Sequence, residues 1–186
     1  MMLTFEKYDE TNAPPESREL LQQSKRNNGG LPALHAIMAE SPQLLAGYQT
    51  LHHLFLHSSF DDEEKTVVWQ TINVEHRCHY CVPAHTLIAR AMKVDEAIND
   101  ALRNETPLPN ARLEALRTFT LAMVRQRGEV DEATLEAFLA AGFTRRHILD
   151  VILCLAQKVM SNYTNHVAHT ELDARLQSVA WQKRTA

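Results

Sequence analysis

Apolar residues recur along this chain at intervals of three and four, the period of an amphipathic helix, while no alternating run is long enough to indicate a strand. The clearest stripe is made by Leu113, Leu116, Phe119 and Met123. A stripe with this spacing follows one side of a helix and needs a core to cover it. The sequence therefore predicts an all-α fold, a compact bundle of helices.

Residues that start helices support this prediction. Ser41 before Pro42 is typical of an N-cap with proline at the first helical position, and predicts a helix to about His57. Asp61 and Glu64 are spaced as in a capping box and predict a helix that runs to about Glu75. Further N-caps are expected at Asn110, Asp131 and Thr144.

The last long helix is apolar on most sides between Ile148 and Met160, so we expect it at the centre of the bundle. Its longest apolar stretch, Val151 to Ala156, lies between Asp150 and Gln157-Lys158. That is far short of the roughly 20 residues needed to span a bilayer, so a membrane is not an expected partner.

The first thirty residues differ from the rest. They contain two consecutive prolines, Pro14 and Pro15, and end in Asn-Asn-Gly-Gly. Both features are typical of turns and loops. We predict an N-terminal arm with one short helix at residues 1–30 and a helical core domain at residues 31–186.

Composition limits the binding partners and the cellular compartment that we expect for this protein. The net charge of -4 comes from scattered acids and bases, so no basic stripe is available for nucleic acid. The N-terminus has acids where a secretory signal has a basic region and an apolar run. Three cysteines are too few for a disulfide framework in 186 residues, which favours a reducing, cytoplasmic location.

The segment Glu75-His-Arg-Cys78-His-Tyr-Cys81-Val-Pro-Ala-His85 carries the chemistry. Residues three and four apart share one side of a helix, so both thiols and the imidazole are expected on one patch. Because Pro83 is not tolerated deep inside a helix, the helix is expected to begin near Cys78 to Tyr80. Cys81 then lies in the first turn, where the helix dipole favours a thiolate.

A thiolate attacks a peroxide oxygen or a disulfide sulfur, and a second cysteine within reach resolves the product as a disulfide. The residues predicted to act are Cys78, Cys81 and His85, with Glu75 as the acid that assists His85. Glu63 and Glu64, on the preceding helix, are alternative acids. No bound organic cofactor and no metal are required.

The motif Cys-His-Tyr-Cys-Val-Pro-Ala-His resembles the alkylhydroperoxidase AhpD-like members of the carboxymuconolactone decarboxylase family. The preceding Thr66-Val-Val-Trp-Gln-Thr-Ile-Asn and the later Ser161-Asn-Tyr-Thr-Asn-His-Val-Ala-His169 are also similar. The likeness covers roughly residues 31–173. It implies an all-helical AhpD-like fold that assembles into homo-oligomers.

The resemblance also implies an antioxidant peroxidase cycle with a redox-active disulfide. Cys81 would attack the hydroperoxide, Cys78 would resolve the sulfenic acid, and His85 would shuttle the proton, while a thiol or dithiol donates electrons. The family's upstream glutamate falls at Thr66 in this chain, so a different acid has to replace it or the activity differs. The decarboxylase members lack the cysteine pair, which disfavours that reaction.

Other interpretations stay open. The pair also suits a thiol-disulfide relay for a protein partner, or the start of a zinc site completed by His85 with His76 or His79 in a non-enzymatic binding protein. Cys154 is interpreted as a core residue. Surface or packing roles are favoured for the remaining histidine clusters, which are His52, His53 and His57, and His166 and His169.

Overall fold

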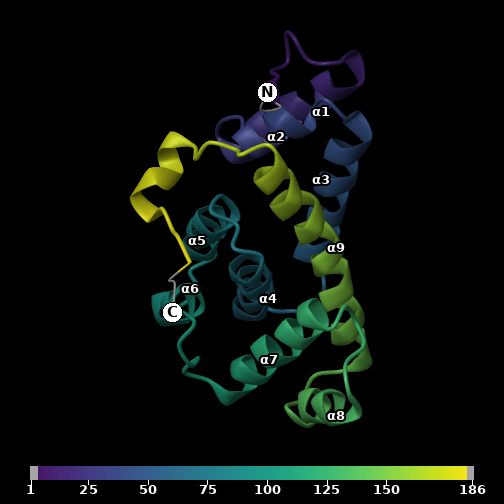
Figure 1. Ribbon diagram of the computed structural model, residues 1–186, viewed down its shortest axis with the longest axis vertical. Helices are drawn as coiled ribbons and strands as arrows, with labels where there is room; N and C mark the ends of the chain where they lie inside the picture. The colour runs from purple at the N-terminus through teal and green to yellow at the C-terminus, as the bar shows by residue number, and fades with distance from the viewer. Residues whose placement is uncertain (1–3, 184–186) are drawn as a thin grey trace.

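A computed structural model describes residues 4–183 and confirms the all-α prediction, since no strand occurs within that range. The helices, labelled in Figure 1, are α1 (Pro15–Asn28), α2 (Ala33–Met38), α3 (Pro42–Leu56), α4 (Asp62–Glu75), α5 (Cys81–Ala91), α6 (Glu96–Asn104), α7 (Ala111–Arg125), α8 (Glu132–Ala140) and α9 (Arg145–Val167), followed by the 3₁₀ helix η1 (Ala174–Val179).

The predicted helix starts are confirmed. The Glu64 N–H donates to Asp61 Oδ1 at 2.8 Å, and the Asp61 N–H donates to Glu64 Oε2 at 3.0 Å, which completes the capping box of α4. Asn110 and Asp131 cap α7 and α8 through their side chains. These local bonds satisfy N–H groups that a helix start otherwise leaves without a partner.

Helix α4 occupies the middle of the bundle and packs against α5, α6, α7 and α9 (Figure 1). Its side chains from Thr66 to Val74 are all buried, Trp69 among them. A helix buried on every side cannot be amphipathic, and α4 accordingly carries Gln70 and Asn73 in the interior. These amides lie beside the cysteine segment that follows.

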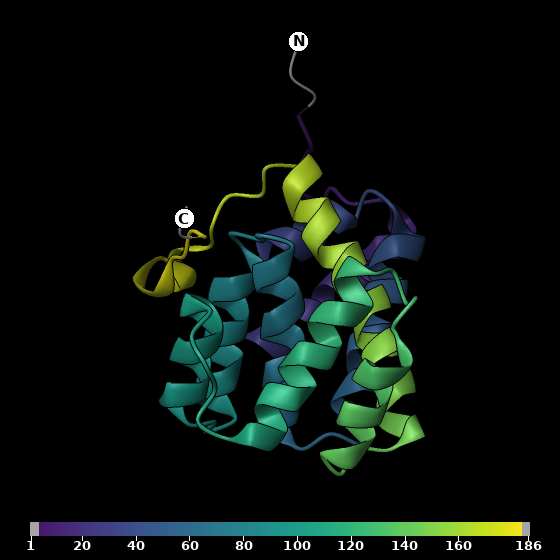
Figure 2. The same cartoon turned by 60° about the horizontal axis from the view of Figure 1, so that its bottom comes forward.

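The core divides into two clusters. One joins apolar residues of α4 to α9 with Phe55 and Phe60. The other joins α1, α2 and α3 with Cys78, Cys81 and Leu176. The C-terminal segment closes this second cluster, because η1 packs against α5, as Figure 2 shows at the yellow end of the chain. The cysteines thus lie where the N-terminal helices meet the rest of the bundle.

Helix α1 belongs to that cluster. It packs against α2 and α3, Leu21 is fully buried, and the Ser17 hydroxyl donates to the Ala39 carbonyl at 2.7 Å. The division of the chain at residue 30 stays a prediction, but α1 shares its packing with the helices that follow.

Helix α9 was expected at the centre of the bundle, but one of its sides is exposed to solvent. The helix packs against α2, α3, α4 and α7, yet Leu149 is 65% and Ile152 46% exposed. Its buried side begins with the apolar Val151 and Cys154 and continues with polar residues such as Lys158 and Asn165. Within residues 4–183 no helix combines the length and hydropathy needed to cross a membrane.

Candidate active site

A short turn between α4 and α5 positions the two cysteines. Arg77 adopts a left-handed conformation with φ 57°, and the Cys78 N–H donates to the Asn73 carbonyl at 2.9 Å. Helix α5 begins at Cys81, just after the predicted start near Cys78 to Tyr80, so Cys81 lies in the first turn as Pro83 predicted. Its N–H donates to Cys78 Sγ at 3.2 Å. The helix start therefore directs a backbone donor at the sulfur of the neighbouring cysteine.

Asn165 on α9 joins the two sulfurs. Its Nδ2 lies 3.2 Å from Cys81 Sγ and 3.8 Å from Cys78 Sγ. Both thiols are free and buried. Because one amide nitrogen contacts both sulfurs, the structure brings the pair together as the sequence predicted.

The surroundings affect the two thiols in opposite directions. Burial acts to raise the pKa of Cys81, but the hydrogen bond from Cys78 and the positive charge of Lys158 outweigh it, and the pKa falls well below the usual value. Burial and the bond to Cys81 raise the pKa of Cys78. These opposite directions favour the thiolate at Cys81 and the thiol at Cys78.

His85 meets Lys158 behind the cysteines. His85 Nε2 lies 2.9 Å from Lys158 Nζ, and both side chains are buried. Burial, together with the Lys158 charge, lowers the pKa of His85 well below its ordinary value. This favours a neutral imidazole whose Nε2 accepts a hydrogen bond from Lys158 Nζ. Lys158, like Asn165, is a site residue that sequence reasoning missed.

A chain of buried amides holds α9 in place beside the pair. Asn162 Nδ2 donates to Asn73 Oδ1 at 3.0 Å, and Asn73 Nδ2 donates to Gln70 Oε1 at 3.1 Å. Gln70 Nε2 in turn donates to the Val82 carbonyl at 3.1 Å, within the first turn of α5. Such a network fixes the orientation of the groups that contact the sulfurs, because each amide would lose a partner if it moved.

A cavity of about 820 Å³ reaches the pair from the side of α1, α3 and η1. Cys81, His85 and Lys158 are part of its wall, whereas Cys78 is not. A molecule in this cavity meets Cys81 first, with Cys78 sealed behind it.

Rings connect His85 to the α3 side of the cavity. The ring centroids lie 4.8 Å apart for Trp69 and His85, 5.6 Å for His52 and Trp69, and 6.3 Å for Tyr48 and His52. Burial and the Lys158 charge lower the pKa of His52 to about 4. His52 therefore contributes a neutral imidazole to the cavity wall, where its ring packs on Trp69.

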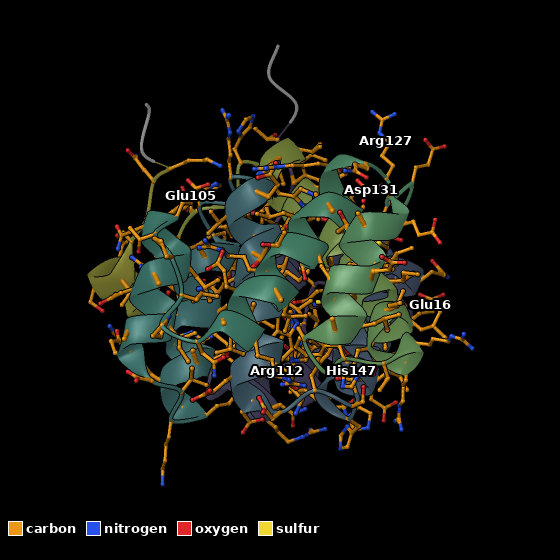
Figure 3. All side chains as sticks on the ribbon, turned by 90° about the horizontal axis from the view of Figure 1, so that it is seen from below. Glu16, Glu105, Arg112, Arg127, Asp131 and His147 are labelled. Carbon is orange, nitrogen blue, oxygen red and sulfur yellow. The ribbon has the colours of Figure 1, made fainter. Side chains whose placement is uncertain are left out.

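Glu75 and Glu64, the acids predicted to assist His85, bind arginines instead. The Glu75 carboxylate accepts from Arg125 Nε at 2.8 Å and Nη2 at 2.9 Å, and this ion pair lowers its pKa. Glu64 is bound by Arg112, which lies at the same end of the bundle as His147 (Figure 3). The charged side chain that hydrogen-bonds to His85 is Lys158.

The remaining sequence candidates lie outside the cavity wall or add no ligand set. Cys154 is fully buried in the first core cluster. His53 and His57 pair on the surface of α3, with centroids 4.4 Å apart. Among the side chains at 4–183, no three His, Cys, Asp or Glu residues are grouped so as to hold a metal ion, which leaves the zinc alternative without ligands there.

No protein-family model and no curated protein matches the sequence. Solved structures do match the fold. The alkylhydroperoxidase AhpD core of an uncharacterised peroxidase-related protein from Ralstonia eutropha JMP134 superimposes with a TM-score of 0.82 at 19% identity, over 95% of both chains. This protein has the AhpD-like fold.

Two further structures agree with this fold assignment. An uncharacterised peroxidase-related protein from Silicibacter sp. TM1040 gives a TM-score of 0.76 at 21% identity, over 93% of this chain and 91% of that one. The debrominase Bmp8, in complex with 2,3,4-tribromopyrrole, gives 0.74 at 16% identity, over 88% and 89% of the two chains. The AhpD-like resemblance inferred from the sequence is confirmed at the level of the fold, within which the neighbours are described as peroxidase-related proteins and a debrominase.

Proposed function

We propose that the protein is a thiol-dependent peroxidase that reduces organic hydroperoxides. The Cys81 thiolate attacks the outer oxygen of R–O–O–H, the O–O bond breaks, and R–O⁻ leaves as Cys81 becomes a sulfenic acid. The Cys78 thiol then attacks the Cys81 sulfur, which forms the disulfide and releases water. A thiol or dithiol donor returns two electrons and two protons to the pair.

One observation carries this assignment of roles: Cys81 is part of the cavity wall and Cys78 is not. The opposite directions of the two pKa shifts support the same roles, since the attacking sulfur has to be a thiolate while the resolving sulfur becomes one only after the first step. Asn165 Nδ2 contacts both sulfurs, which supports a disulfide between Cys78 and Cys81 because such a bond needs the two sulfurs close together.

We propose that the Lys158–His85 pair donates the proton that the leaving alkoxide takes up. The departing alkoxide needs a proton, and these two groups line the same cavity as Cys81 with 2.9 Å between their nitrogens. The Lys158 charge has a second role, since it stabilises the Cys81 thiolate before attack. Glu75, which is engaged with Arg125, is a less suitable partner for His85 in this scheme.

The test is a titration of free thiols. One equivalent of cumene hydroperoxide should remove two thiols from the reduced protein and leave Cys154 free. Cys81→Ser should abolish the loss. Cys78→Ser should still react, but should stop at a sulfenic acid that a dimedone-type reagent traps. If the cysteine pair does not react with hydroperoxides but reacts quickly with a protein disulfide, the result would contradict the peroxidase function and support a thiol-disulfide relay.

Reductive debromination is a second candidate, favoured by the likeness to the debrominase that binds 2,3,4-tribromopyrrole and by a cavity large enough for a ring. In that reaction R–Br and two thiols give R–H, a disulfide, a proton and bromide, so the same pair supplies both electrons. Bromide release from 2,3,4-tribromopyrrole, measured beside hydroperoxide turnover, separates the two. Homo-oligomeric assembly and a cytoplasmic location stay predictions.

A further inference from the structure

The cavity that leads to Cys81 is much larger than a small peroxide requires. Its volume is about 820 Å³, whereas a water-sized molecule occupies on the order of 30 Å³. Apolar side chains from α1, α2, α3, α5 and η1 line it, namely Leu20, Leu34, Leu56, Leu87, Ile88 and Leu176. Such a wall favours a substrate with an extended apolar body.

The charges in this wall have one sign. Lys158 and Arg175 belong to it, while no Asp or Glu of the described chain does. The wall thus differs from the whole sequence, in which acids outnumber bases, with 23 Asp and Glu against 19 Lys and Arg. A cavity that is apolar and cationic attracts a ligand with an anionic group.

The two cations lie at different depths. Lys158 is fully buried beside Cys81 and His85. Arg175 is exposed, so it lies where the cavity reaches the surface. Because Lys158 already faces the Cys81 thiolate, a second anion there would be repelled, and the anionic end of a ligand is better placed at Arg175.

The structure holds Arg175 in this position. Its Nη1 donates to the Asn28 carbonyl at 2.9 Å, which leaves its remaining N–H groups available. The neighbouring Asp173 fixes η1, since its carboxylate accepts from Tyr80 Oη at 2.6 Å and from the Ala33 N–H at 3.1 Å. No carboxylate in residues 4–183 forms an ion pair with Arg175.

We infer that the cavity takes long-chain organic carboxylates, and that the hydroperoxide it presents to Cys81 is an amphipathic acid whose carboxylate binds Arg175 at the rim. This inference rests on the proposed peroxidase function. The apolar chain lies along the leucines, and the hydroperoxide group reaches Cys81 with the carboxylate kept away from the thiolate.

Binding of ligands without a peroxide group tests the recognition separately from the chemistry. Oleic acid should bind the reduced protein about fivefold more tightly than methyl oleate, because a partly exposed ion pair contributes about that much. Arg175→Gln should remove the difference and Arg175→Lys should keep it. Arg26→Gln is the matched control, since Arg26 is exposed on α1 and lies outside the cavity wall.

Turnover then tests the substrate class. The kcat/KM for linoleic acid hydroperoxide should exceed that for its methyl ester. Arg175→Gln should equalise the two values, whereas Arg26→Gln should preserve the difference and leave turnover of cumene hydroperoxide unchanged. Equal binding of acid and ester, or an acid preference that survives Arg175→Gln, would overturn the inference. If every hydroperoxide is reduced but acid and ester do not differ, only this inference fails. If no hydroperoxide is reduced, the proposed function fails.

Discussion

Helices α7 and α9 bury stripes of the same spacing but of opposite chemistry. The buried stripe of α7 consists of Leu113, Leu116, Phe119, Thr120 and Met123. That of α9 begins with Val151 and Cys154 and continues with Gln157, Lys158, Ser161, Asn162 and Asn165. Burying a lysine and several amides costs free energy that apolar side chains do not cost. The buried side of α7 therefore stabilises the fold, whereas we propose that the second half of α9 serves the chemistry of the cysteines.

The largest expected effect separates Cys81, the cysteine that α9 contacts through Asn165, from Cys154, which lies on α9 itself. Cys81→Ser should lower hydroperoxide turnover at least about a thousandfold, because no other side chain supplies the nucleophile. Cys154→Ser, on the buried apolar part of α9, is the control and should retain turnover once folded. A Cys81→Ser protein with substantial turnover would remove Cys81 from the mechanism.

The stripe of α7 should affect stability instead. Phe119 is 1% exposed and stacks on Phe138 with ring centroids 4.1 Å apart. Phe119→Ala should lower the free energy of unfolding by about 3–5 kcal/mol in chemical denaturation. The fraction that remains folded should turn over hydroperoxide at an unchanged rate, and a loss of rate as large as that of Cys81→Ser would break the comparison.

Lys158 should show the reverse pattern. Lys158→Met should reduce kcat/KM about a hundredfold. The Cys81 thiolate would lose its positively charged neighbour, and His85 would lose the group that donates a proton to it. The free energy of unfolding should stay the same or rise, because a methionine fills a similar volume without a buried charge. A lysine that stabilises the fold and leaves the rate untouched would contradict the role given to α9.

The pH dependence of alkylation sharpens the same point. Because the pKa of Cys81 is lowered, its thiolate persists as the pH falls below 9.0, the ordinary value for this group, and reactivity is lost only as the pH passes the lowered value. Iodoacetamide labelling, located by mass spectrometry, should therefore reach Cys81 at neutral pH. Lys158→Met should move the midpoint upward. Cys154, whose pKa burial raises, should stay unlabelled.

The smallest effect is expected at Glu75. Because its carboxylate pairs with a mostly exposed Arg125, Glu75→Gln should change stability by about 1 kcal/mol or less. Turnover should change less than about threefold, compared with the hundredfold loss for Lys158→Met. A larger loss than at Lys158, with the pH profile shifted, would return Glu75 to the acid's role.

Much of the fold could be predicted from short-range signals. The capping box at Asp61 and the N-caps at Asn110 and Asp131 depend on neighbouring backbone groups, so their residues alone predict them. The start of α5 followed in the same way from Pro83, which tolerates only the first turn. Cys78, Cys81 and His85 were found together because they are close in sequence as well as in space.

Lys158 and Asn165 were missed because their role depends on packing between distant elements. Lys158 is 73 residues from His85, and its neighbours Leu155 and Ala156 indicated an ordinary buried helix. The available signal was spacing, since Cys154, Lys158, Ser161 and Asn165 recur at three and four on one side. Glu75 is the opposite case: it adjoins the motif in sequence, but α4 ends there and its carboxylate accepts a hydrogen bond from Arg125.

The most direct test is to locate the bond that forms after oxidation. Reduced protein treated with one equivalent of hydroperoxide, then unfolded in denaturant, alkylated and digested, should yield a peptide with a disulfide between Cys78 and Cys81 and an alkylated Cys154. A disulfide that includes Cys154, or a pair that stays fully alkylated while the hydroperoxide is consumed, would contradict the account.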